Sequence, residues 1–140
     1  MYLTQETVYA VRIVYCLAKS AARKDAASLG AQMSVTLRFS LKILGKLSTA
    51  GIVKSFKGTH GGYELARAPA LITLKDIVDA VEGEPYAISR CISEGGECNR
   101  GASGCCAFQH HFSQISASIN EQLSAVNFAD LLSEESARQA

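Results

Sequence analysis

The stretch from Cys91 to His111, CISEGGECNRGASGCCAFQHH, constrains the fold of this chain most. It holds four of the five cysteines and two of the three histidines. Glycines lie between the sulfurs, at Gly95, Gly96, Gly101 and Gly104. Such a segment is too rich in glycine for a helix and too polar for a buried strand. A metal site or a disulfide is therefore expected to give it its shape.

Length and composition are typical of a folded protein with one domain, or with one small domain and an appendage. The chain has 140 residues, of which 48% are hydrophobic and 19% are charged. No apolar run approaches the length of a membrane span, and the amphipathic N-terminus does not have the pattern of a signal peptide. We therefore expect a cytoplasmic protein that does not bind membranes. Thiols stay reduced there, and clustered cysteines more often bind metals or undergo redox chemistry than form structural disulfides.

The charges are distributed unevenly along the chain. Residues 1–75 contain eleven lysines and arginines against three acidic residues, a net charge of +8. Residues 76–140 contain three against ten, a net charge of −7, so the formal net charge of the chain is +1. Binding to phosphates requires local rather than total positive charge, so the first part is expected to carry a face that binds a polyanion. Chance clustering of solvated surface charge is the alternative.

The first part of the chain predicts three helices. One begins after a cap at Thr4 and ends near residue 20. Two shorter helices follow over residues 25–47, capped by Asp25 and Thr36 and joined by a turn at Ser34. Leucines at helical spacing form the expected inner face of the third helix, at Leu37, Leu41, Leu44 and Leu47.

Two short helices joined by a tight turn, with basic and hydroxyl residues facing outward, are typical of a helix-turn-helix. A hairpin follows directly, because residues 52–57 and 63–66 alternate as strands and glycines suit the tip between them. A hairpin in this place is a wing. The residues expected to contact DNA lie on the recognition helix and the wing: Thr36, Arg38, Ser40, Lys42, Lys54, Lys57 and His60. A solvated turn residue is the alternative for His60.

Two further helices flank the cysteine-rich stretch. Thr73 and Asp76 form a capping-box-like pair at the start of one. After the cysteines, apolar residues recur every three or four positions to about residue 127, and the polar tail from residue 133 is expected to fray. A helix this long beyond a winged domain suits a dimer arm. The expected fold is mainly α with a small β-wing. It comprises a winged helix-turn-helix domain (1–84) whose first helix also contributes to the dimer interface, a cysteine-rich loop (85–106), and a dimerisation helix with its tail (107–140).

Four segments of the chain match a known family: MYLTQETVYAVR, VTLRFSLKILGKLSTAGIVKS, KGTHGGYELAR and ITLKDIVDAVEGEP. Over nearly its full length the chain resembles the Rrf-type winged helix-turn-helix transcription regulators, the group that includes IscR and NsrR. The resemblance implies a cytoplasmic homodimer that binds a palindromic operator on double-stranded DNA. Many members carry an iron–sulfur cluster on three cysteines just before the dimerisation helix, where this chain has its own cysteines.

The resemblance implies Cys91, Cys98 and Cys106 as ligands of a [2Fe–2S] or [4Fe–4S] cluster. The segment NFADLL places Cys106 in register with the third cysteine of the family, and Cys105 is the alternative. The spacing differs from the commonest one, in which five residues separate successive cysteines. Six residues lie between Cys91 and Cys98.

The fourth ligand also departs from the family's usual positions. Those positions hold Gln109, where some members have a histidine, and Val8, where others have an acidic residue from the partner subunit. The resemblance therefore leaves His110 or His111 as the expected ligand, with Glu6 of the partner subunit or Cys105 as alternatives. The alternative interpretation is that the two histidines are not ligands but solvated side chains at the start of the dimerisation helix.

These features predict a transcriptional repressor whose operator binding depends on a cluster that senses redox state, nitric oxide or iron–sulfur status. Zinc is one alternative and needs four ligands, such as Cys91, Cys98, Cys106 and His110. A thiol/disulfide switch that uses the vicinal Cys105 and Cys106 is a second, and binding of a partner enzyme without a cluster is a third. We expect no enzyme, because the chain has no C-x-x-C pair in a βαβ setting and no paired acid and base in a plausible pocket.

Overall fold

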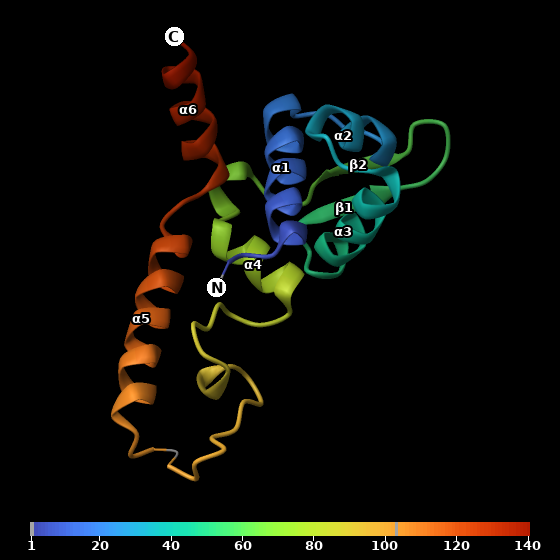
Figure 1. The fold of residues 1–140 in the computed structure, drawn as a ribbon. Coiled ribbons are helices and arrows are strands. Elements are labelled where there is room, and N and C mark those ends of the chain that lie inside the picture. The colour runs from blue at the N-terminus through green and yellow to red at the C-terminus, as the bar shows by residue number, and fades with distance from the viewer. Residues whose placement is uncertain (1, 103) are drawn as a thin grey trace.

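As far as residue 124, the helices and strands follow the order expected from the sequence. A computed structural model describes residues 2–102 and 104–140 (Figure 1). The α-helices are α1 (Gln5–Ser20), α2 (Ala26–Met33), α3 (Leu37–Thr49), α4 (Leu74–Glu82), α5 (Ala107–Ser124) and α6 (Phe128–Gln139). Strands β1 (Val53–Phe56) and β2 (Gly62–Leu65) pair antiparallel, and the short 3-10 turns are η1 (Pro69–Leu71) and η2 (Arg90–Ile92). The chain is thus mainly helical with one small antiparallel sheet, as expected.

The elements form a head and an arm. Helices α1 to α4 and the β1–β2 hairpin make up the head, and α5 extends away from it toward the cysteine-rich loop at the far end (Figure 1). Helix α1 lies at the centre of the head, where it contacts α2, α3, α4 and α6. Within the described residues, no helix is both long and apolar enough to cross a membrane.

The helices begin where side chains can accept the first free backbone N–H groups. The predicted caps at Thr4, Asp25 and Thr36 are confirmed, since each side chain accepts a hydrogen bond from a backbone N–H three residues on. The capping box of Thr73 and Asp76 at the start of α4 is also confirmed. These caps fix the start of α3, and with it the position of its exposed side chains.

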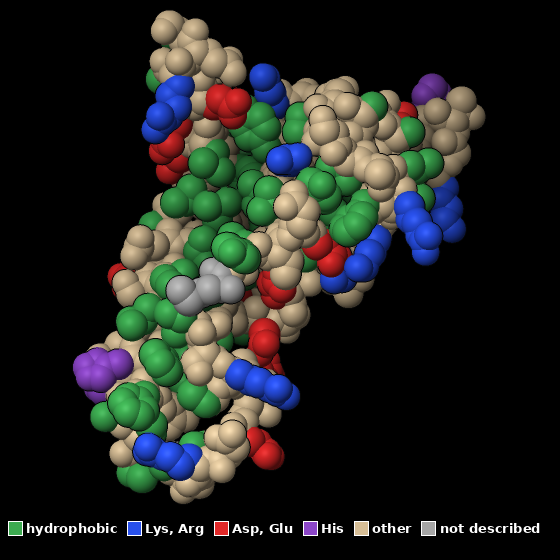
Figure 2. Space-filling model, in the orientation of Figure 1, with side chains coloured by type: hydrophobic (Ala, Val, Ile, Leu, Met, Phe, Trp, Pro, Cys, Tyr) green, Lys and Arg blue, Asp and Glu red, His purple; other side chains and the backbone are tan. Residues whose placement is uncertain are grey.

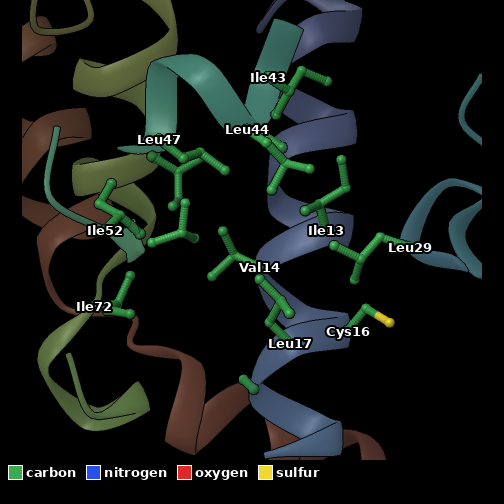
Figure 3. Close-up of a cluster of buried hydrophobic side chains, with 14 of the residues drawn as sticks. Ile13, Val14, Cys16, Leu17, Leu29, Ile43, Leu44, Leu47, Ile52 and Ile72 are labelled. Carbon is green, nitrogen blue, oxygen red and sulfur yellow. The ribbon is translucent and has the colours of Figure 1, made fainter. Parts of the chain in front are cut away.

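The core of the head is built around α1 (Figure 3). Ile13 and Val14 of α1 are fully buried against apolar side chains from α3 and from the segments that flank the wing. The labelled members of this cluster in Figure 3 are Ile13, Val14, Cys16, Leu17, Leu29, Ile43, Leu44, Leu47, Ile52 and Ile72. Burying each large aliphatic side chain contributes roughly 1.5–3 kcal/mol, so this cluster is the main support of the head.

The inner face of α3 differs from the expected one. Leu44 and Leu47 are buried as predicted, but Leu37 and Leu41 are 52% and 48% exposed. Ser40 and Ile43 take their places in the core, both of them fully buried. The prediction was wrong because it followed only leucines, whereas α3 is rotated so that the small Ser40 faces α2.

The close approach of α2 to α3 depends on Gly30. A Cβ on this residue would lie 2.5 Å from the carbonyl oxygen of Val35 and 2.8 Å from Ser40 Oγ. Gly30→Ala is therefore expected to lower the free energy of unfolding by about 1–3 kcal/mol. Gly45→Ala in α3 is the matched control, because its Cβ would meet no described atom within 4 Å. The control should gain roughly 0.5–1 kcal/mol in denaturant unfolding, and a similar loss in both variants would contradict the close packing.

The C-terminal segment is ordered as α6, so the expectation of a frayed tail was wrong. The helix continues to Gln139, and its first residue, Phe128, is fully buried in the core of the head. The backbone N–H of Phe128 donates to the carbonyl of Ile72 at 3.1 Å, which returns the chain from α5 to the head. Leu131 and Leu132 add partly buried contacts one turn further on. Helical spacing of these three apolar residues is enough to dock a segment that is otherwise polar.

Candidate nucleic-acid interface and metal centre

The α2–turn–α3 unit presents the N-terminal end of α3 on the surface. The turn is tight because Ser34 adopts a left-handed backbone, with φ 60°, and Val35 N–H donates to Gly30 O at 2.9 Å. Thr36 caps α3, and both Thr36 and Arg38 are exposed. Within the described chain Arg38 forms no ion pair. Both side chains are thus free to meet DNA, and their contact with it stays a prediction.

Ser40 does not belong to this surface. It is fully buried, and its Oγ–H donates to the Thr36 carbonyl oxygen at 2.8 Å. A side chain with no exposed area cannot reach a base or a phosphate without unfolding of the α2–α3 contact. The prediction that Ser40 contacts DNA was therefore wrong, because outward and inward positions on α3 were assigned from its leucines alone.

The lysines of α3 are paired with one carboxylate of α1. The carboxylate of Glu6 accepts a hydrogen bond from Lys42 Nζ at 3.3 Å and forms an ion pair with Lys46 Nζ at 2.9 Å. Burial raises the pKa of Glu6, but hydrogen bonds from Lys46 and then Lys42 outweigh it, so the pKa lies below its usual value of 4.5. Lys42 keeps 58% of its side chain exposed and remains a predicted phosphate contact. Glu6 is occupied by two cations, which weakens the alternative that it ligates a metal in a partner subunit.

A second carboxylate ties α4 to the start of α1. Glu82 accepts hydrogen bonds from the hydroxyl groups of Thr4 and Thr7, each at 2.6 Å. Burial raises its pKa, but these hydrogen bonds outweigh it, so the pKa of Glu82 also lies below its usual value of 4.5. The sequence showed no sign of this contact, since 75 positions separate Thr7 and Glu82.

Stability is expected to fall in acid as Glu6 and Glu82 gain protons. Both carboxyls have a lower pKa in the folded than in the unfolded chain, so the unfolded chain binds more protons as the pH falls. Their stabilisation is complete above the unfolded pKa of about 4.5 and is lost as the pH falls through the folded pKa values. Denaturant unfolding between pH 7 and about pH 3 measures the loss. Glu82→Gln should flatten this profile, and an unchanged profile in that variant would contradict the assignment.

The wing is held in place by a residue that the sequence did not identify. The guanidinium of Arg23, just before α2, lies 3.4 Å from the ring centre of Phe56 and donates to the carbonyl oxygen of His60 at 3.0 Å. Lys24 and Tyr63 also exchange backbone hydrogen bonds, which join the same segment to β2. These contacts fix the hairpin tip relative to α2. No local pattern marks Arg23, because its partners lie more than 30 positions away.

The predicted wing residues are all exposed. Lys54 lies on β1, Lys57 follows it, and His60 lies in the tip between the strands. Histidine side chains gather at two separate places in Figure 2, one at the wing tip and one beside α5. Lysine and arginine side chains lie near the wing (Figure 2). The exposed positions of these wing residues agree with a role in binding phosphates, and that role stays a prediction.

The four loop cysteines lie between α4 and α5 and are all free thiols. Cys91 lies in η2, where its sulfur is 3.1 Å from Ser89 Oγ. Cys98 Sγ accepts the backbone N–H of Ala102 at 3.4 Å. Backbone N–H groups, that of Ala102 first, lower the pKa of the Cys98 thiol. Cys98 is therefore predisposed to the thiolate form that metals bind.

Gln109 connects this loop to α5. Its side-chain amide donates to the carbonyl oxygen of Cys91 at 3.3 Å and accepts the backbone N–H of Gly104 at 3.2 Å. The resemblance described above implied a histidine ligand at this position, and here Gln109 ties two parts of the loop together. His110 and His111 are both exposed at the start of α5, with ring centres 5.7 Å apart.

The beginning of the loop is also fixed to α5. Ile88 N–H donates to Ser116 Oγ at 2.9 Å, and the side chain of Asn120 donates to the Tyr86 carbonyl oxygen at 2.8 Å. Ser116 is buried, so the side of α5 that carries Ser116 and Asn120 faces the chain. The loop is thus attached to α5 near residues 86–91 and again through Gln109.

The donor atoms suit an iron–sulfur cluster or zinc, but they are not assembled. In the part of the chain that the structure describes, no three His, Cys, Asp or Glu side chains lie close enough to hold a metal ion. Four thiols on a single glycine-containing loop, one of them with a lowered pKa, are nevertheless the chemistry that such a cluster requires. The proposed ligands Cys91, Cys98 and Cys106, and the alternative Cys105, therefore stay a prediction.

Known proteins resemble this chain in sequence and fold. The family model Rrf2, described as an iron-dependent transcriptional regulator, matches residues 3–134. A relative from Azotobacter vinelandii, named as HTH-type transcriptional regulator ORF2, is 31% identical over 134 residues, which cover 94% of this chain and 79% of the relative. The structure of T. potens IscR superposes with a TM-score of 0.77 at 22% identity, covering 100% of this chain and 92% of that one. The structure of CymR of B. subtilis, described as its global cysteine regulator, superposes with a TM-score of 0.74 at 23% identity. The match covers 96% of this chain and 98% of that one.

Proposed function

The chain belongs to the Rrf2 family of transcriptional regulators, and on that premise we propose that it is a repressor controlled by an iron–sulfur cluster on residues 91–111. Membership of this family makes it a DNA-binding regulator rather than an enzyme. The observation that carries the finer proposal is the cysteine-rich loop. Along the chain this loop follows the DNA-reading head and precedes α5, and it is hydrogen-bonded to α5. We place the protein in the cytoplasm, where thiols stay reduced.

The proposed DNA-binding surface runs from α3 to the wing. The exposed N-terminal end of α3 suits a phosphate beside Thr36, and Arg38 suits bidentate contact with guanine. Lys54 and Lys57 are exposed on the wing and would add phosphate contacts, which make affinity depend on salt. His60 at the tip would reach the adjacent backbone or minor groove. The palindromic operator that we propose would present this surface twice.

The apolar side of α5 supports a homodimer. Phe108, Phe112 and Ile115 follow one another at helical spacing and are 65%, 37% and 44% exposed. Beside this apolar side, Ser116 is buried and accepts a hydrogen bond from Ile88 N–H, so α5 meets the chain's own loop there and leaves the three apolar side chains exposed. A second copy of α5 is the occupant that we propose for the apolar side, because it would bury these side chains and set two α3 helices on one operator.

Cys91, Cys98 and Cys106 are the proposed cluster ligands, with Cys105 as the alternative third ligand. His110 or His111 is proposed as the fourth ligand, because they lie near the start of α5, four and five residues after Cys106. A bound iron–sulfur cluster supplies a redox-active centre, which is the basis for proposing redox state, nitric oxide or iron–sulfur status as the signal.

The chain offers a physical connection from the loop to the DNA-reading helix. Helix α4 leads into the loop, and Lys46 of α3 donates from Nζ to the Val81 carbonyl oxygen near the end of α4 at 3.1 Å. Glu82, the last residue of α4, holds Thr4 and Thr7 at the start of α1. A rearrangement of the loop would therefore shift α4 against α1 and α3. Control of DNA binding would then be a coupling between two sites, without contact between the loop and DNA.

Metal content tests the cluster directly. Wild-type protein purified without oxygen should be coloured and should contain iron and acid-labile sulfide, whereas Cys91→Ala should lose both. Cys16→Ala is the matched control, because Cys16 is 4% exposed in the core and donates to Gln32 Oε1. Colourless wild-type protein, or undiminished iron in Cys91→Ala, would overturn the cluster assignment.

Thiol control is the second function that a specific observation favours. Cys105 is an exposed free thiol adjacent to Cys106, another free thiol. The similar fold of CymR, described as a global cysteine regulator, is consistent with this alternative. A disulfide found by mass spectrometry, together with altered DNA affinity and no bound metal, would support it. Stoichiometric zinc would point to a structural metal instead, and a protein partner that copurifies without metal would point to control by another enzyme.

A further inference from the structure

The exposed surface of α3 is more apolar than that of an ordinary solvated helix. Leu37 and Leu41 lie four residues apart on one side of α3 and are 52% and 48% exposed. Phe39 is also exposed, but its ring packs edge-on against Tyr9, with ring centres 5.7 Å apart. The two leucines are therefore the large apolar side chains of α3 that most need a partner from outside the chain.

The positive charge of α3 is mostly committed inside the chain. Lys42 and Lys46 are held by Glu6, and Lys46 also donates to the backbone of α4. In the described part of the chain, Arg38 is the cation of α3 that forms no ion pair. The outward surface at the start of α3 thus combines two leucines with one unpaired guanidinium.

The major groove of DNA offers matching groups. Thymine is the base that presents an apolar group there, its C5 methyl, and guanine presents two acceptors that suit a guanidinium. The N-terminal residues of a recognition helix are the ones that meet base edges. We propose that Leu37 and Leu41 contact thymine methyl groups beside a guanine bound by Arg38. This assignment rests on the proposed DNA-binding function and specifies the bases that the operator contains.

The surroundings of the two leucines favour DNA over an apolar protein partner. Thr36 at the helix N-terminus and the exposed lysines Lys54 and Lys57 of the wing lie in the half of the chain that carries a net charge of +8. An apolar protein surface would leave this charge without partners, whereas phosphates on both sides of a major groove would neutralise it.

The test uses the full chain and DNA selected from a random pool. Each thymine of the selected site is then replaced by deoxyuridine, which lacks the C5 methyl but keeps every hydrogen-bonding group. Wild-type protein should lose roughly four-fold in affinity for each contacted methyl. Leu37→Ala and Leu41→Ala should each lose the sensitivity to deoxyuridine at one thymine. Leu71→Ala is the control and should behave as wild type, because Leu71 is also exposed, at 65%, but lies in η1, outside α3 and the wing.

Two outcomes would overturn the inference while leaving the proposed function intact. One is a selected sequence that wild-type protein binds equally well with thymine and with deoxyuridine. The other is full sensitivity to deoxyuridine in both leucine variants, which would mean that another residue reads the methyl groups. Failure to select any sequence would instead contradict the proposed function itself, and capture of a protein on the two leucines would replace the inference with a protein-binding role.

Discussion

Phe128→Ala is expected to lower the free energy of unfolding by about 3–5 kcal/mol, the usual cost of removing a fully buried aromatic ring. Phe128 is 0% exposed and belongs to the same buried cluster as the core of α1. Its backbone N–H is bonded to Ile72, and Leu74 N–H donates to the Val126 carbonyl oxygen at 3.0 Å. The ring thus anchors the segment that joins α5 to the head. Because domains of this size are stable by only about 5–15 kcal/mol, the variant should lose a large share of its stability.

Two controls separate this effect from a general loss of apolar area. Phe128→Leu keeps most of the volume and should cost less than half as much as alanine. Leu71→Ala removes an exposed side chain and should stay within about 0.5 kcal/mol of wild type. Urea unfolding followed by circular dichroism measures all three variants. A loss below about 1 kcal/mol in Phe128→Ala would show that α6 does not dock in the core.

Arg38→Ala is expected to weaken binding to the selected operator by about 5- to 150-fold, the range for loss of one bidentate base contact. Arg38 is exposed on α3 and forms no ion pair in the described chain, so its loss should not disturb the fold. Binding to unrelated DNA should fall much less, so the ratio of specific to non-specific affinity should drop.

Lys54→Ala is the matched comparison for that variant. A wing lysine that contacts phosphate should weaken binding to all sequences equally and reduce the dependence of log Kd on log salt by about one unit. Fluorescence anisotropy at several salt concentrations distinguishes the two patterns. If Arg38→Ala behaves like Lys54→Ala, Arg38 contacts phosphate and does not read a base.

The parts of the fold that could be predicted from sequence are those fixed by local chemistry. Caps at Thr4, Asp25, Thr36 and Thr73 need only a side-chain oxygen and a nearby backbone N–H. The hairpin likewise depends on residues next to one another in the chain. The place of the cysteine-rich loop before a long helix was also evident, since it follows from the order of segments along the chain.

The features that could not be predicted depend on distant partners. The rotation of α3 follows from its contact with Gly30, so Ser40 was assigned outward and Leu41 inward in error. The docking of α6 depends on Phe128 finding a site near Ile72. The hydrogen bond from the Gln109 side chain to the Cys91 carbonyl oxygen likewise joins residues 18 positions apart. Periodicity within one helix cannot reveal which of two apolar sides meets a neighbour.

The central claim is that the loop cysteines control DNA binding. The most direct test compares the operator affinity of protein with and without these cysteine ligands and their iron. Binding is measured without oxygen for wild type, for wild type after iron is removed by a chelator, for Cys91→Ala, and for Cys16→Ala as control. We predict that iron removal and Cys91→Ala change the operator Kd alike, by about five-fold or more, while Cys16→Ala matches untreated wild type. Equal operator affinity in all four samples would contradict control of DNA binding by a cluster on this loop.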